Sequence, residues 1–130
     1  MMLVRTKISE SDIEGAGLGC FAEEFIPAGT CIWRFSPDFD KCFTEKDLQK
    51  VSRVEMEFLE KYSYRHGGNY FLCVDNGRFF NHSDSPNTWE SKEEQATYAL
   101  TDISPGEEIL SDYRNFGCTD DDLVFNFTLK

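Results

Sequence analysis

Chemistry could reside in the polar segment at residues 78–88, RFFNHSDSPNT, because it holds His82, one of the chain's two histidines. A histidine can act as a general base, but a catalytic triad also needs a positioned nucleophile and an orienting acid. Ser83 adjoins His82 without a pattern that turns it toward the imidazole. Asn, Ser, Asp and Pro favour turns. Taken alone, the segment fits a turn as well as a reactive centre.

Metal binding by the same segment has little support. Only His66 could join His82 as a second imidazole ligand, and no carboxylate follows either residue at metal-ligand spacing. No CxxC pair occurs among the five cysteines, which are Cys20, Cys31, Cys42, Cys73 and Cys118. We therefore expect no metal site, and we expect free buried thiols in a reducing compartment.

Two further stretches combine turn residues with groups that could contact a ligand. GAGLG, residues 15–19, lacks the full GxGxxG fingerprint, but close glycines let backbone approach a ligand or adopt positive φ. PGEEILSDY ends in Tyr113, at the end of a predicted strand, where a tyrosine is commonly a core residue with a hydrogen-bonded hydroxyl. Adjacent Glu107 and Glu108 point to opposite faces of a strand, so we predict a solvated turn rather than an acid–base pair.

Short strands must position these stretches. Alternating or continuous apolar residues predict strands near residues 4–8, 20–22, 31–35, 70–75, 96–103 and 109–113. No internal repeat or low-complexity linker interrupts them. The pattern predicts a mostly β domain with a small helical insertion.

Residues 44–62 carry the helical signal. Thr44 with Asp47, and Ser52 with Glu55, match the spacing of capping boxes, so we predict two short helices rather than one long helix. Their predicted buried faces comprise Leu48, Val51, Phe58, Leu59 and Tyr62.

Composition narrows the functional classes. A chain of 130 residues with 15% aromatics and 12 Phe is expected to form one packed domain. Its apolar runs are too short for a transmembrane span or a signal peptide, which predicts an intracellular protein, in the cytoplasm or nucleus. A formal net charge of −11 argues against nucleic-acid binding. The charge suits a cationic partner, although it also serves solubility.

In this order, GLGCFA, RFFNHSDSPN and PGEEILSDY resemble the SET-domain protein-lysine methyltransferases. The similarity extends from near residue 5 to near residue 113. It implies a SET-domain fold of several small curved sheets with a short helical insertion. It also implies a C-terminal pseudoknot that brings RFFNHS against ILSDY. Because it has no cysteine-rich zinc-binding flanks, the sequence resembles the minimal, free-standing members found in viruses and bacteria.

The resemblance implies S-adenosylmethionine as the cofactor. By this analogy, the backbone around Gly17, Leu18 and Gly19 cradles the methionine part of the donor. Asn81 and His82 hold its amino and adenine groups, largely through main-chain hydrogen bonds. The remaining implied contacts are Phe79, beside the pocket, and Tyr113, the catalytic residue.

The implied substrate is the ε-amine of a lysine in a basic protein, possible examples being histone-like proteins. Tyr113 is expected to orient the amine, and Ser111 stands where many members carry Phe or Tyr. Residues 114–130 form a tail that we expect to close the substrate channel with Phe116, Phe125 and Phe127. Three aspartates in the tail, Asp120, Asp121 and Asp122, would attract the cationic side chain.

The sequence is also compatible with two other functions. A non-catalytic SET-like module would bind a basic peptide or the cofactor without turnover, and a small amine could replace the protein substrate. The sequence allows either a monomer or a homodimer.

Overall fold

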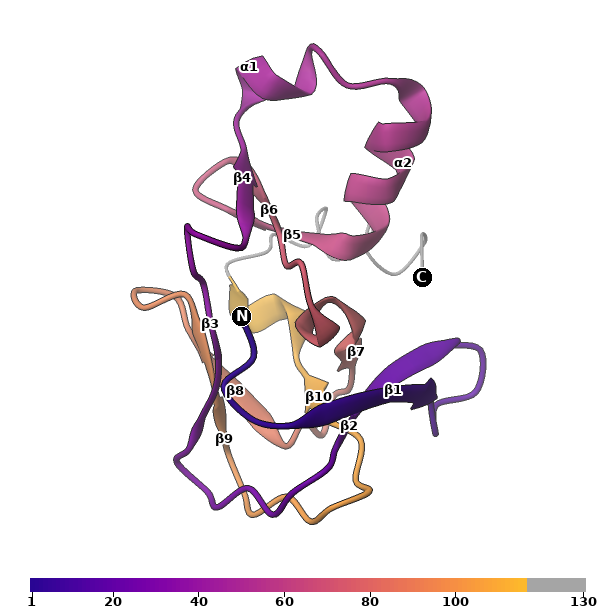
Figure 1. Cartoon of the computed structure of the whole chain (residues 1–130), viewed down its shortest axis with the longest axis vertical. Coiled ribbons are helices and arrows are strands. Elements are labelled where there is room, and N and C mark those ends of the chain that lie inside the picture. The colour runs from indigo at the N-terminus through magenta and orange to yellow at the C-terminus, as the bar shows by residue number, and fades with distance from the viewer. Residues whose placement is uncertain (117–130) are drawn as a thin grey trace.

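The computed structural model describes residues 1–116, and the framework within them consists of short strands in small sheets (Figure 1). One antiparallel pair joins β1 (Thr6–Glu10) to β2 (Leu18–Ala22). A three-stranded sheet has the order β3 (Cys31–Arg34), β9 (Ala96–Ala99), β8 (Thr88–Ser91). A second three-stranded sheet has the order β4 (Lys41–Phe43), β6 (Asn69–Leu72), β5 (Ser63–His66). This arrangement is the mostly β fold that the sequence predicts.

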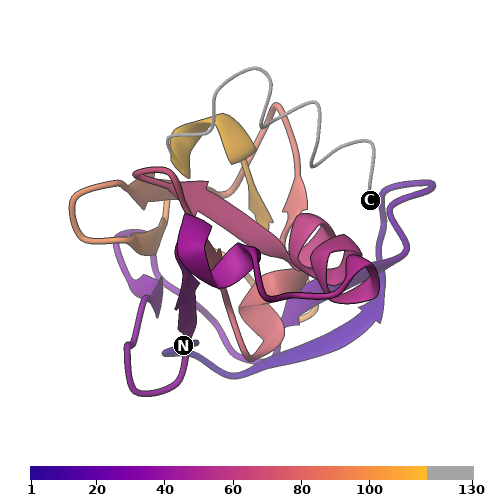
Figure 2. The same ribbon diagram turned by 90° about the horizontal axis from the view of Figure 1, so that it is seen from above.

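Two helices follow β4 and form the insertion, α1 (Glu45–Leu48) and α2 (Arg53–Tyr62). Seen from above, they lie in front of the rest of the chain (Figure 2). Both predicted capping boxes are confirmed: Thr44 and Ser52 each accept a hydrogen bond from the third residue of the helix, whose carboxylate bonds the cap backbone in return. The hydrogen bond from the cap backbone lowers the pKa of Asp47 and of Glu55.

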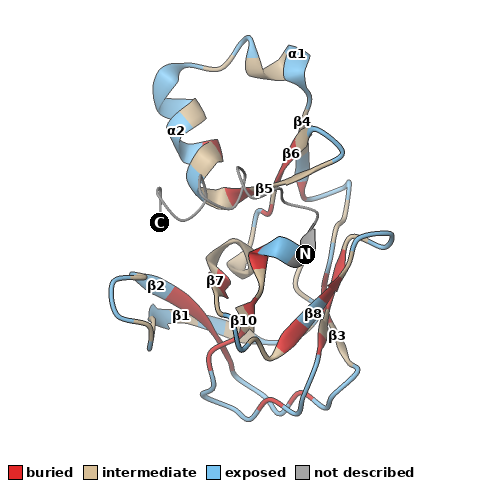
Figure 3. Ribbon diagram, turned by 180° about the vertical axis from the view of Figure 1, so that it is seen from behind, coloured by how far each residue is buried: buried red, intermediate tan, exposed pale blue. Residues whose placement is uncertain are grey.

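The predicted buried faces of these helices are largely wrong. Of the five residues expected there, only Leu59 is buried, and Phe58 is 40% exposed. The helices lie at one end of the molecule and cover little of the core, so their apolar stripe is partly solvated (Figure 3). None of the helices in the described part of the chain is long and apolar enough to cross a membrane.

The main core lies between β1–β2 and the β3–β9–β8 sheet. Its centre is filled by fully buried side chains from several elements, including Ile26, Ile32, Ile103 and Ile109. Trp33 donates its indole N–H to the Cys73 sulfur across 3.0 Å, which joins this core to the end of β6. Burial raises the pKa of the Cys73 thiol to about 12, so the sulfur is a neutral thiol at physiological pH.

Several predicted strands differ from the observed ones. The run at 70–75 was expected to be fully buried, but β6 ends at Leu72 and Val74 is 44% exposed. Tyr113 was expected to end a strand, yet it begins the 3₁₀ helix η2 (Tyr113–Phe116). Pairing partners distant in sequence decide these boundaries, because a short strand persists only where a neighbour supplies hydrogen bonds.

The C-terminal part of the described chain passes against the 81–88 segment. Strand β10 (Leu110–Ser111) pairs in parallel with β7 (Asn81–His82), and the Ser83 N–H donates to the Ser111 carbonyl across 2.9 Å. This contact confirms the implied meeting of RFFNHS with ILSDY. A 3₁₀ helix, η1 (Asn76–Phe79), leads into β7 from the core side.

The side chain of Asn87 also holds the backbone of β10 in place. Its Nδ2 donates to the Glu108 carbonyl and its Oδ1 accepts from the Leu110 N–H, each across 2.8 Å. Thr88 adds a hydroxyl hydrogen bond to the Leu110 carbonyl. The strand that precedes Tyr113 is therefore held by side chains on one flank and by β7 on the other.

Replacing Asn87 by Ala removes both side-chain hydrogen bonds to a part-buried backbone. We expect the free energy of unfolding to fall by about 2–3 kcal/mol, since one unsatisfied backbone group costs about 1–3 kcal/mol. Urea denaturation followed by circular dichroism measures the change. Asn69→Ala, in the β5–β6 hairpin, is the matched control and should lose less than about 1 kcal/mol. Equal losses in the two variants would contradict the role assigned to Asn87.

Candidate functional site

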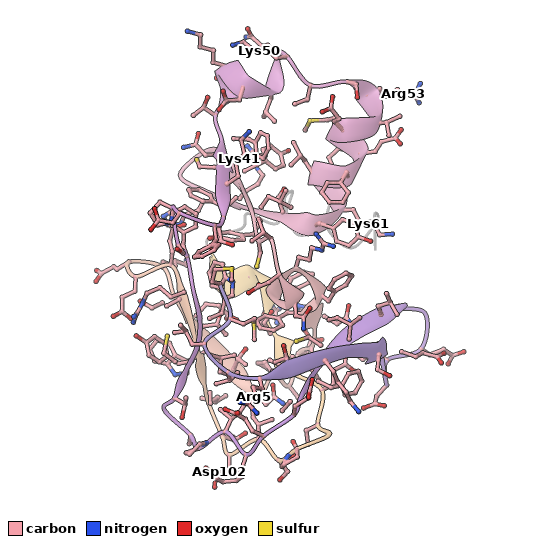
Figure 4. All side chains as sticks on the ribbon, viewed as in Figure 1. Arg5, Lys41, Lys50, Arg53, Lys61 and Asp102 are labelled. Atoms are coloured by element: carbon pink, nitrogen blue, oxygen red, sulfur yellow. The ribbon has the colours of Figure 1, made fainter. Side chains whose placement is uncertain are left out.

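A cavity of about 260 Å³ opens between the glycine-rich loop, the end of α2 and η1. Its lining comprises Gly15, Ala16, Gly17, Leu18, Lys61, Tyr62, Arg78, Phe79 and Asn81. Lys61 lies at the C-terminal end of α2, beside β5 (Figure 4). The cavity thus combines exposed backbone, two aromatic rings and two cationic side chains.

The glycine-rich loop reaches the cavity because its backbone turns between β1 and β2. Gly15 and Gly17 have φ of 80° and 78°, a region that favours glycine. Gly19 has no such constraint, but it packs closely: a Cβ there would overlap the Glu108 carboxylate and approach Asn81 Nδ2 within 3.2 Å. The third glycine therefore permits close packing rather than a turn.

Glu108 holds the loop, β2 and β7 together. It is only 5% exposed, and its carboxylate accepts hydrogen bonds from the Ser11 hydroxyl, the Asp12 N–H and Asn81 Nδ2, all between 2.8 and 2.9 Å. Asn81 Nδ2 also donates to the Leu18 carbonyl across 3.0 Å. The predicted solvated turn is wrong for Glu108, although Glu107 is exposed. Adjacent side chains on a strand point to opposite faces, and this alternation could have identified one of Glu107 and Glu108 as buried.

Arg78 brings a positive charge to the cavity wall. Its guanidinium lies over the rings of Phe79, Tyr62 and Phe58, at 5.1, 5.6 and 6.0 Å from their centroids. The Nε atom is buried without a hydrogen-bond partner among the described residues. An anionic group in the cavity would pair with the charge of the guanidinium. The sequence does not identify Arg78, Lys61 or Tyr62 as residues of a binding site, because only folding brings α2 beside η1.

Tyr113 contacts the segment that lines the cavity without lining the cavity itself. Its side chain is 9% exposed, and the hydroxyl donates to the Phe80 carbonyl across 2.6 Å. Phe80 directly precedes Asn81, which lines the cavity. The phenolic proton is thus directed to a backbone carbonyl, so toward any other group the hydroxyl oxygen can act only as an acceptor.

His82 contacts the same tyrosine through its ring. The backbone N–H of Tyr113 donates to His82 Nδ1 across 3.2 Å, and the two ring centroids are 5.4 Å apart. His82 Nε2 lies 3.0 Å from the Asp84 carboxylate. The imidazole therefore joins the 81–84 turn to the start of η2.

The structure brings some of the predicted site residues together and separates others. Gly17, Leu18, Phe79 and Asn81 line the cavity, whereas Gly19, His82 and Tyr113 adjoin it without lining it. Ser111 is 1% exposed, and its carbonyl faces the Ser83 N–H. Phe125 and Phe127 lie outside the described residues, as do Asp120, Asp121, Asp122 and the side chain of Phe116. Residues 1–116 contain no cluster of three or more His, Cys, Asp or Glu side chains arranged to hold a metal ion.

The chain is similar to known proteins over most of its length. A family model described as SET domain matches residues 17–114. The Schizosaccharomyces pombe protein named histone-lysine N-methyltransferase, H3 lysine-37 specific, is 30% identical over 116 residues, covering 85% of this chain and 76% of the relative.

Solved structures share the fold. A Plasmodium falciparum protein described as a candidate histone methyltransferase matches with a TM-score of 0.60 and 22% identity, covering 86% of this chain and 95% of that one. The Chaetomium thermophilum Polycomb repressive complex 2 bound to S-adenosylmethionine matches with a TM-score of 0.67 and 21% identity, over 93% of this chain and 16% of that one.

Replacing Glu108 by Gln tests the buried carboxylate. The amide NH₂ replaces one carboxylate oxygen and must then face a donor, either the Asp12 N–H or Asn81 Nδ2. We therefore expect the free energy of unfolding to fall by about 2 kcal/mol. Glu107→Gln is the matched control one residue away, and as an exposed substitution it should change stability by less than about 0.5 kcal/mol. Guanidinium denaturation of both variants makes the comparison. A Glu108→Gln variant as stable as the control would show that the carboxylate does not hold these segments.

Proposed function

We propose, because this chain belongs to the SET domain family, that it methylates lysine side chains of a histone-like basic protein. The chain is an S-adenosylmethionine-dependent protein-lysine N-methyltransferase, and S-adenosylmethionine is its cofactor. The observation that carries the proposal is the placement of the Tyr113 hydroxyl on the Phe80 carbonyl, one residue from the cavity wall at Asn81. A basic substrate suits the net charge of −11.

The cavity fits the proposed cofactor by its chemistry. Arg78, whose Nε has no hydrogen-bond partner among the described residues, and Lys61 are suited to a carboxylate. The aromatic faces of Tyr62 and Phe79 suit a planar base or a cationic group. We assign the backbone of Gly17, Leu18 and Gly19, together with Asn81 and His82, to the remaining polar groups of the donor. Bound S-adenosylmethionine supplies an electrophilic methyl group on a sulfonium.

The chain's own contribution to the reaction is alignment. A lysine amine attacks only when it is neutral, and its free pKa is about 10.4. Desolvation beside aromatic side chains lowers that pKa, so the proton leaves to solvent before the attack. The Tyr113 proton points to the Phe80 carbonyl. The hydroxyl oxygen therefore accepts a hydrogen bond from the lysine amine, and this contact orients the lone pair of the amine nitrogen. No side chain is needed as a strong base, which agrees with the structural role of His82.

Substrate and location remain parts of the proposal. The relative's substrate, lysine 37 of histone H3, makes a histone-like protein the first substrate to test. Such a substrate would place the enzyme's action in the nucleus or cytoplasm. Ser111 is small and buried beside β7, and we assign it to the wall of the lysine channel.

Tyr113→Phe should separate donor binding from methyl transfer. The variant loses the hydroxyl that orients the amine, so we expect kcat to fall by about 10²–10³-fold, the usual cost of one transition-state hydrogen bond. The affinity for S-adenosylmethionine, measured by calorimetry, should change less than about threefold because Tyr113 does not line the cavity. Transfer of labelled methyl to recombinant histone H3 and other basic proteins measures kcat.

The control for this experiment is Tyr98→Phe. The Tyr98 hydroxyl bonds Glu94 on an exposed face across 2.7 Å, so its loss should leave the rate unchanged. Donor binding without labelling of any basic protein, by the unaltered chain, would instead support a non-catalytic binding module. Failure to bind the donor at all would refute both functions.

The tail supplies a second test. We propose that residues 114–130 close the lysine channel through Phe116, Phe125 and Phe127, with Asp120, Asp121 and Asp122 attracting the cationic substrate. Deleting residues 117–130 should abolish methyl transfer while the remaining domain still melts cooperatively, because the buried side chains of the main core come from residues 20–109. Undiminished activity of the truncated chain would refute this assignment.

Two full-length variants separate the two parts of the tail. Phe125→Ala with Phe127→Ala should lower kcat, because the channel would admit water. Asp120→Asn, Asp121→Asn and Asp122→Asn together should raise KM for histone H3 with less effect at high ionic strength, where such attraction is screened.

A further inference from the structure

The imidazole of His82 has partners with fixed hydrogen-bonding roles on both of its nitrogens. The Tyr113 backbone N–H, 3.2 Å from Nδ1, can only donate. The Asp84 carboxylate, 3.0 Å from Nε2, can only accept when ionised. These two roles require a lone pair on Nδ1 and a proton on Nε2. The contacts therefore select one neutral tautomer of the ring.

Asp84 is itself held by a cation. Arg114 places its Nη2 3.0 Å from Asp84 Oδ1 and 2.7 Å from Asp112 Oδ2, and its Nε donates to Asp112 across 2.8 Å. The hydrogen bond from Arg114 lowers the pKa of Asp112, so that carboxylate stays ionised at physiological pH. Arg114 thus bridges the turn after β7 and the start of η2, on either side of Tyr113.

We propose that Asp84 and Arg114 are positioning residues that hold His82 as the Nε2–H tautomer, and that this neutral imidazole sets the backbone position of Tyr113. The inference rests on the proposed function in that Tyr113 orients the substrate amine. It adds that the tyrosine is fixed at two points. The hydroxyl is anchored on Phe80, and the backbone N–H is anchored on His82.

Acidification should break the second anchor. Protonation places a hydrogen on Nδ1, which then faces the Tyr113 N–H as a second donor. Asp112 Oδ1, 3.8 Å from Nδ1, is the acceptor to which the new N–H can turn. The charged groups that face the ring in the described part of the chain are Asp84 and Asp112, with Arg114 beside both. The imidazolium therefore exchanges its tyrosine contact for a carboxylate contact, and methyl transfer falls.

The exposure of the partners sets the size of the effect. The Asp84 side chain is 82% exposed and that of Arg114 is 50% exposed, so solvent screens their ion pair. Their main effect is on the tautomer and geometry rather than on global stability. We expect Asp84→Ala to lower kcat by roughly three- to tenfold, the range of one ordinary hydrogen bond. Donor affinity should stay unchanged.

Imidazole ¹⁵N NMR tests the tautomer without any methyl transfer. The chain has two histidines, so a His66→Gln variant assigns the His82 signals. We expect the Nε2–H tautomer to predominate at pH 8 in the full-length protein. In Asp84→Ala only the Tyr113 N–H still selects the tautomer, so the Nδ1–H fraction should rise. Asp38→Ala, at an exposed aspartate away from this group, is the matched control. The Tyr113 amide signal should differ between the full-length protein and Asp84→Ala, because its hydrogen-bond acceptor is held less firmly in the variant.

The pH profile of the rate tests the consequence. His82→Asn can place an uncharged acceptor near the Nδ1 position, whereas His82→Gln places its amide near the Nε2 position. The ratio of the wild-type rate to the His82→Asn rate on histone H3 cancels the ionisation of the substrate amine. We expect this ratio to fall as the pH is lowered. His82→Gln should be slower than His82→Asn at pH 8.

Either of two results would overturn the proposal. One is a predominant Nδ1–H tautomer in the full-length protein. The other is an Asp84→Ala variant with the wild-type tautomer and the wild-type pH profile. If the protein transfers no methyl group, the proposed function fails, while the NMR measurements still decide whether Asp84 and His82 position Tyr113.

Discussion

A buried carboxylate is the constraint on which the rest of the site depends. Glu108 lies inside the protein and accepts hydrogen bonds from Ser11, Asp12 and Asn81, which are neutral donors. Burying an ionised carboxylate is costly unless several donors satisfy it. The loop between β1 and β2, the start of β7 and the strand leading to Tyr113 must therefore meet at one point. A change in any of the three would leave the charge unsatisfied.

That meeting point brings the cavity lining and the Tyr113 hydroxyl to one short segment, residues 78–81. Asn81 faces the cavity with its neighbours Arg78 and Phe79, while the Phe80 carbonyl accepts the Tyr113 hydroxyl. Parallel pairing of β10 with β7 sets the distance between them, because it aligns Leu110 with Asn81 and Ser111 with His82. The site is thus organised by backbone register, and few side chains need to act directly on the reacting atoms.

Local signals in the sequence were predictive where the interaction itself is local. The capping boxes at Thr44 and Ser52 link residues three positions apart, and both formed as predicted. The buried face of α2 was mispredicted, because an amphipathic pattern shows which side is apolar without showing what covers it. Glu108 was mispredicted for a related reason. Its partners at Ser11 and Asp12 are 96 to 97 residues away in the chain.

The sequence by itself determined the family, through three motifs in a fixed order, and with it the class of chemistry; it also predicted Gly17, Asn81, His82 and Tyr113 as site residues. Motif residues are recognisable because each must meet a backbone or ligand requirement that few residue types satisfy. Only the tertiary structure decided that Arg78 and Lys61 line one cavity, and that the imidazole of His82 accepts a hydrogen bond from the backbone N–H of Tyr113. Those relations depend on α2 packing beside η1 and on β10 lying against β7, and such long-range contacts leave no periodic pattern in the chain.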